Sequence, residues 1–68
     1  MNELRDEILT YYDMLCAENG CKWVELRRLT GVVCSRCSIT EDQFHLWLLA
    51  QDNMHDRIFA GSCYICLT

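Results

Sequence analysis

Two pairs of cysteines, each with the spacing C-x-x-C, place the strongest constraint on how this short chain folds. They are Cys34 with Cys37, and Cys63 with Cys66. Two such pairs can hold one tetrahedral zinc ion, and the bound metal would then contribute folding energy directly. The alternative is that cysteine serves as a small hydrophobic residue of the core. The choice matters because a chain of 68 residues has only a marginal core of its own.

The residues around the pairs weaken the zinc interpretation. Ser38 and Leu67 follow the pairs, at positions where zinc knuckles usually have glycine. On a regular strand, Cys63 and Cys66 would also point to opposite faces. Three alternatives stay open, in order of preference: reduced core thiols, a structural zinc site and disulfides. The zinc ligands would be Cys34, Cys37, Cys63 and Cys66, with His45 as a substitute.

Composition indicates one acidic domain over residues 1–68, without repeats or a linker. The N-terminus lacks the basic start and apolar run of a secretory signal, and no apolar stretch approaches the roughly 20 residues that span a bilayer. We therefore expect a cytoplasmic protein that does not bind membranes. A net charge of −4, with six lysines and arginines in total, disfavours DNA as the main partner.

Apolar residues recur at helical spacing in three segments of the chain. We expect helices over Asn2 to about Ala17, over Trp23 to about Thr30, and from Thr40 to about Asp52. Gly20 and Gly31 are the expected stops of the first two helices. The segment 32–38 is the least determined. Thr40 and Gln43 have the spacing of a capping box, which predicts where the third helix begins.

The C-terminal segment predicts a β-hairpin. Arg57 to Ala60 and Cys63 to Leu67 are the expected strands, with Gly61 and Ser62 at the turn. The chain order is then helix, helix, helix, hairpin, which indicates an α+β fold.

The third predicted helix is apolar on nearly all sides. Phe44, Trp47 and Leu48 form one face at 100° per residue. Leu46, Leu49 and Ala50 lie on the other side. A short chain can rarely bury both faces of such a helix. We therefore predict that Leu46, Leu49 and Ala50 contact a partner protein or a second copy of the chain.

This order of elements resembles the winged helix-turn-helix fold. The stretches that carry the resemblance are "WVELRRL", "ITEDQFHLWLLAQ" and "DRIFAGSCYICL". It implies that "CKW" forms a first strand that pairs with the hairpin. It also implies core contacts from Leu26, Leu29, Phe44, Leu48 and Ile58. In that family the third helix enters the DNA major groove, and the hairpin, or wing, touches an adjacent groove or phosphates.

Here the sequence departs from the family, because "TEDQFHLWLLAQD" contains no lysine or arginine. We predict a non-enzymatic interaction module, an accessory subunit or inhibitor that binds a protein of a nucleic-acid-handling machine. The acidic first helix would provide its electrostatic contact. One alternative is a dimeric DNA-binding regulator that contacts phosphates through Arg27, Arg28, Arg36 and Arg57. The other alternative is a zinc-stapled mini-domain. We find no spacing that requires a catalytic set.

Overall fold

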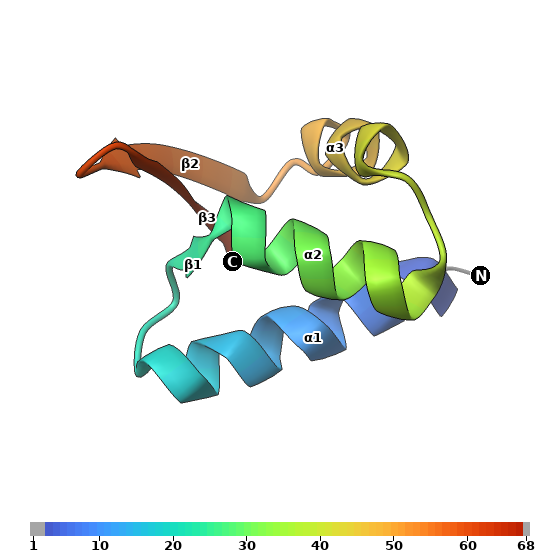
Figure 1. Cartoon of the computed structure of the whole chain (residues 1–68), viewed down its shortest axis with the longest axis horizontal. Coiled ribbons are helices and arrows are strands. Elements are labelled where there is room, and N and C mark those ends of the chain that lie inside the picture. The colour runs from blue at the N-terminus through green and yellow to red at the C-terminus, as the bar shows by residue number, and fades with distance from the viewer. Residues whose placement is uncertain (1–2, 68) are drawn as a thin grey trace.

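The computed structural model describes residues 3–67 of the chain. Within this range it contains three helices and a three-stranded antiparallel sheet, which confirms the predicted α+β class. The elements are α1 (Glu3–Asn19), β1 (Val24–Glu25), α2 (Leu26–Cys37), α3 (Glu41–Leu49), β2 (Met54–Phe59) and β3 (Ser62–Leu67). In Figure 1, α2 lies between α1 and α3, and the β2–β3 hairpin extends away from the helices.

The first helix agrees with the prediction and runs slightly further, to Asn19. Its buried stripe consists of Ile8, Tyr12 and Leu15. Gly20 ends the helix as predicted: its φ is 72°, and its N–H donates to the carbonyl of Cys16 at 2.8 Å. Asn2, the predicted N-terminal cap, lies outside the described residues.

The second helix differs from the predicted short helix over 23–30. α2 continues through Gly31 to Cys37, so the prediction that Gly31 ends it is wrong. A glycine inside a helix costs about 1 kcal/mol relative to alanine. Leu29 and Val33 lie one turn apart on either side of Gly31, and both are completely buried. Their burial offsets the glycine, since each such side chain contributes about 1.5–3 kcal/mol.

The first strand forms directly after the predicted "CKW" (residues 21–23), so it begins three residues later than expected. β1 pairs with β3, with Val24 opposite Ile65 and Glu25 opposite Tyr64. The expected pairing of an early strand with the C-terminal hairpin is therefore present. Val24 is completely buried, and packing of this β-branched side chain anchors the strand to the core.

The sheet has the order β1-β3-β2, so β3 is the central strand and β2 is an edge strand. β2 begins at Met54, three residues before the predicted start of the strand. The turn consists of Ala60 and Gly61, one residue earlier than predicted. Both residues have positive φ angles, 53° and 81°. This is the pattern of a two-residue type I′ loop, whose twist matches that of the flanking strands.

The core lies where α1, α2 and α3 meet the end of β3 that is far from the turn. Its buried residues are Ile8, Tyr12, Leu15, Val24, Leu29, Val33, Phe44, Leu48, Ile65 and Leu67. Leu26, which the resemblance places in the core, is only partly buried. Ile58, also placed there, is 79% exposed, so that prediction is wrong. Ile58 pairs with Cys63 near the turn, where the hairpin has extended past the helices (Figure 1).

No helix within residues 3–67 is long and apolar enough to cross a membrane.

Candidate functional site

α3 begins at the predicted capping box. The hydroxyl of Thr40 accepts a hydrogen bond from the backbone N–H of Gln43 at 3.1 Å. The side-chain oxygen of Gln43 accepts one from the backbone N–H of Thr40 at 2.9 Å. This reciprocal pair fixes the start of the helix. The helix ends at Leu49, before the predicted end near Asp52.

The inner face of α3 fixes how the helix is rotated. Phe44 is completely buried and Leu48 is 3% exposed. Trp47 is partly buried and stacks on Phe44, with ring centroids 6.4 Å apart and ring planes 13° apart. The predicted inner face, made of these three residues, is therefore the face that packs on the core. Because these side chains are held by packing, the opposite side of the helix has a defined orientation.

The outer face of α3 consists of Asp42, Leu46 and Leu49, together with the C-cap residue Ala50, and these four residues lie within about 100° of one another around the helix axis. Leu46 is 68% exposed and Leu49 is 72% exposed. Asp42 and Ala50 are exposed as well. The sequence placed Leu46, Leu49 and Ala50 opposite the buried face, and the structure places them there. Their role as an interface stays a prediction.

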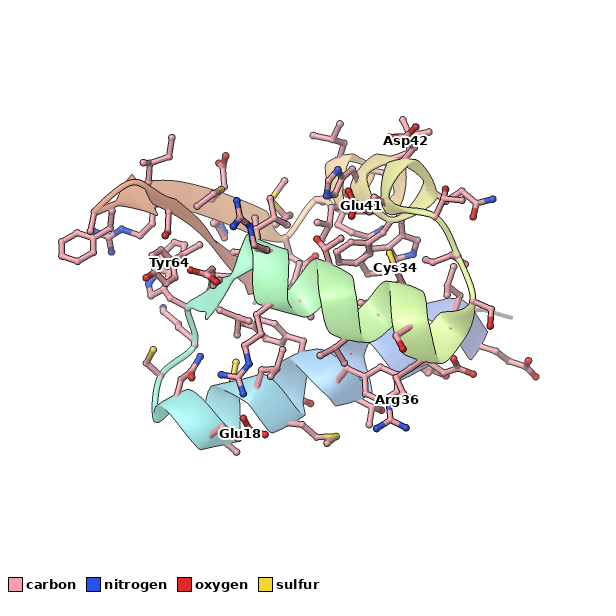
Figure 2. All side chains as sticks on the ribbon, in the orientation of Figure 1. Glu18, Cys34, Arg36, Glu41, Asp42 and Tyr64 are labelled. Atoms are coloured by element: carbon pink, nitrogen blue, oxygen red, sulfur yellow. The ribbon has the colours of Figure 1, made fainter. Side chains whose placement is uncertain are left out.

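The first turn of α3 is acidic. Glu41 and Asp42 are exposed, and the helix contains no lysine or arginine. In Figure 2, Asp42 lies on the side of α3 turned away from α2, whereas Glu41 and Cys34 lie between the two helices. The helix dipole places about half a positive charge at this end, and the two carboxylates outweigh it. The N-terminal half of α3 is therefore negative, while the C-terminal half of its outer face is apolar.

A cleft of about 690 Å³ lies between α3, the first half of α2 and the end of the hairpin. Glu41 and His45 line it from α3, and Cys63 lines it from β3. The hydroxyl of Thr30, on α2, hydrogen-bonds the Nε2 atom of His45 at 3.4 Å. This volume is in the range of small-molecule pockets, about 300–1,000 Å³. The cleft therefore has room for side chains of a partner beside the outer face of α3.

The sequence did not predict the apolar tip of the hairpin. Ile58 is 79% and Phe59 is 66% exposed at the end of β2. Ile58 pairs with Cys63, and directly opposed residues of an antiparallel pair point to the same face. Ile58 therefore lies on the same face of the hairpin as Cys63, which lines the cleft. The sequence did contain one indication of this exposure, because Ile58 lies near the turn of the expected hairpin.

The four arginines of the DNA-binding alternative lie on different parts of the surface. Arg27 lines the cleft, and Arg36 lines a groove between α1 and α2. Arg28 hydrogen-bonds and forms an ion pair with Glu18 on α1. The guanidinium carbon of Arg57 lies 5.1 Å from the ring centroid of Trp23. Figure 2 places Arg36 and Glu18 away from α3. These residues therefore do not form one basic face together with α3.

All six cysteines are free thiols. Cys34 and Cys37 lie in the last half of α2, and Cys63 and Cys66 lie on β3. Within residues 3–67, no three histidine, cysteine or acidic side chains gather closely enough to hold a metal ion. The four cysteines of the zinc alternative therefore do not fit a zinc site in this arrangement.

Burial raises the pKa of three of these thiols. It raises the pKa of the Cys16 and Cys34 thiols. It also raises the pKa of Cys37, with the Glu7 carboxylate adding to the effect, to about 11. Because the thiolate is the reactive form of cysteine, these three side chains are poor nucleophiles near neutral pH.

Comparison with protein families, curated proteins and solved structures found no match to this chain. The interpretation of the surface therefore depends on its own geometry and charge.

Proposed function

We propose that the chain is a winged-helix-type domain that acts by binding a protein. The order helix, short strand, helix, helix and hairpin supports this assignment, as does the sheet order β1-β3-β2. In such a domain, α3 and the hairpin are the elements that meet the target. Fold alone does not determine which kind of target that is.

The function that we infer is that of a non-catalytic interaction module, an accessory subunit or inhibitor of a protein in a nucleic-acid-handling machine. The observation that carries it is the exposure of Leu46 and Leu49, 68% and 72%, on a helix without a basic residue. Full burial of a leucine is worth about 1.5–3 kcal/mol. Two leucines that are mostly exposed therefore offer a partner several kcal/mol of binding energy. The raised pKa values of the Cys16, Cys34 and Cys37 thiols, which burial causes, make these three residues poor nucleophiles, consistent with a role by contact.

The same features argue against DNA as the target. A duplex would bring its phosphates toward Glu41 and Asp42 at the start of α3. Non-specific DNA affinity comes mainly from lysine and arginine contacts to phosphate. Arg28 is already paired with Glu18, and Arg57 lies over Trp23.

The test is affinity capture from a lysate. It compares the wild type with a double variant that carries Leu46→Ser and Leu49→Ser, and Met14→Ser is the control. Met14 is 54% exposed on α1, so the control removes an exposed apolar side chain elsewhere. We expect the double variant to lose the partners that the wild type and Met14→Ser retain. Sedimentation of each variant reports whether the partner is a second copy of the chain.

Two results would contradict the proposal. The first is that the double variant captures the same proteins as the wild type, which would mean that the outer face of α3 is not the contact. Binding to duplex DNA that weakens steeply with added salt would favour the DNA-binding alternative instead. Arg27→Gln and Arg36→Gln would then be expected to reduce the steepness of that salt dependence.

A further inference from the structure

The outer face of α3 combines two kinds of contact in a fixed order. Leu46, Leu49 and Ala50 have the spacing i, i+3, i+4, which forms one continuous apolar patch on a helix. Asp42 lies one turn before Leu46 on the same face. We infer that this face receives an amphipathic helix of a partner protein, with lysine or arginine at one end of its apolar stripe. This inference rests on the proposed function and specifies the chemistry of the partner.

The apolar half of the face favours a helix as the partner element. Rows of side chains spaced three and four residues apart form the ridges that pack into the grooves of a second helix. Leu46 and Leu49 provide such a ridge, and the small side chain of Ala50 allows a close approach beside it. Ile58, across the cleft on the hairpin, offers a second exposed apolar contact.

The acidic half of the face specifies the charge of the partner. Asp42 lies at its N-terminal end, Glu41 lines the cleft beside the helix, and Asp56 is exposed on β2. Arg27, on α2, is the cation that lines the cleft beside Glu41. The carboxylates therefore outnumber the positive charges around the cleft and the outer face. A lysine or arginine opposite Asp42 would be attracted, whereas an acidic residue there would be repelled.

The test uses three fluorescently labelled peptides of about 18 residues, long enough to form a helix on binding. The first has a leucine stripe flanked by lysines, and the second has the same stripe flanked by glutamates. The third has the composition of the first in a scrambled order without a stripe. Fluorescence anisotropy at about 50 mM and 300 mM NaCl gives each dissociation constant and its dependence on screening.

Two double variants of the protein separate local charge from net charge. Glu41→Gln with Asp42→Asn removes two carboxylates from the first turn of α3. Glu3→Gln with Asp6→Asn removes two from the first turn of α1, where both are exposed, and changes the net charge equally. Because α2 lies between α1 and α3 (Figure 1), this variant also tests separately the electrostatic contact that the sequence predicts for α1. We expect the lysine peptide to bind at least about tenfold more tightly than either other peptide. The α3 variant should weaken it about threefold to tenfold, as loss of one or two surface ion pairs does, and the α1 variant should not.

The remaining outcomes overturn the inference in distinguishable ways. Equal binding of the lysine and glutamate peptides, lost in Leu46→Ser with Leu49→Ser, would leave an apolar interface and remove the charge specificity. If the α1 and α3 variants weakened binding of the lysine peptide equally, or if the scrambled peptide bound tightly, the affinity would come from net charge and not from the outer face of α3. If the lysine peptide bound the leucine double variant as tightly as the wild type, the inference and the proposed interface would both fail. Failure of the lysine peptide to bind would overturn the inference alone.

Discussion

The hydroxyl of Tyr12 on α1 accepts a hydrogen bond of 3.1 Å from the backbone N–H of Leu67, at the end of β3. The same hydroxyl donates to the carbonyl of Lys22, just before β1. Tyr12 is 4% exposed, and burial raises its pKa, so the proton that it donates is retained. The Tyr12 side chain therefore joins α1 both to β3, the central strand, and to the segment that precedes β1.

We expect Tyr12→Phe to lower the free energy of unfolding by about 1–3 kcal/mol, because it leaves the buried Leu67 N–H without its acceptor. In a domain of this size, each kcal/mol corresponds to a fall of about 4–8 °C in Tm. Tyr11→Phe is the matched control, since Tyr11 is partly buried and its hydroxyl makes no hydrogen bond within the described residues. Urea titration of both variants measures the difference. Equal loss in the two variants would contradict the role of the hydrogen bond.

Adjacent leucines on α3 provide a test of how the helix is oriented. Leu48 is 3% exposed and Leu49 is 72% exposed. We expect Leu48→Ala to destabilise the protein by about 2–5 kcal/mol through loss of burial and formation of a cavity. Leu49→Ala should change the free energy of unfolding by less than about 0.5 kcal/mol. Thermal unfolding of both variants measures this contrast, and a large effect of Leu49→Ala would mean that the residue belongs to the core.

The features of α3 that the sequence predicted depend on local signals. Thr40 and Gln43 are three residues apart, and their hydrogen bonds lie within the first turn of the helix. The split between Phe44 and Leu48 on one side and Leu46 and Leu49 on the other follows from helical periodicity alone. These properties need no information about the rest of the chain, so they could be read from the sequence.

The features that the sequence did not predict depend on distant contacts. Gly31 reads as a helix stop, and only the burial of Leu29 and Val33 against the rest of the core shows why α2 continues through it. The cleft could not be predicted for the same reason. Its lining residues come from α2, α3 and the hairpin, which the fold brings together.

The hairpin turn provides a prediction in the stabilising direction. Ala60 has a φ of 53°, in a region that costs a residue with a Cβ about 1–2 kcal/mol. Asparagine tolerates this region better, and Asn-Gly is the preferred type I′ pair. We expect Ala60→Asn to raise the free energy of unfolding by about 0.5–1 kcal/mol. Gly61→Ala, at a φ of 81°, should lower it by about 1 kcal/mol. Urea midpoints that move together in one direction would contradict this assignment of the turn.

The buried thiols predict how stability and reactivity depend on pH. Burial, with Glu7 adding to it, raises the pKa of Cys37 from 9.0 to about 11. Because the native pKa lies above the unfolded value, the native state favours the protonated thiol. The stability that this provides is fully present below about pH 9 and is lost as pH rises toward 11. The raised pKa values of Cys16 and Cys34 act in the same direction.

Alkylation measures this shift directly. At pH 8, a thiol with a pKa of about 11 is ionised in about one molecule in a thousand, against about one in ten for a pKa of 9. Iodoacetamide should therefore modify Cys37 about a hundredfold more slowly in the native protein than in urea. The native rate should rise about tenfold per pH unit from 7 to 10, whereas the rate in urea should level off above about pH 9. Peptide mapping resolves Cys37 from the exposed Cys21, which serves as an internal control for reagent access. A native rate that also levels off near pH 9 would show that the Cys37 thiol is not shielded by the fold.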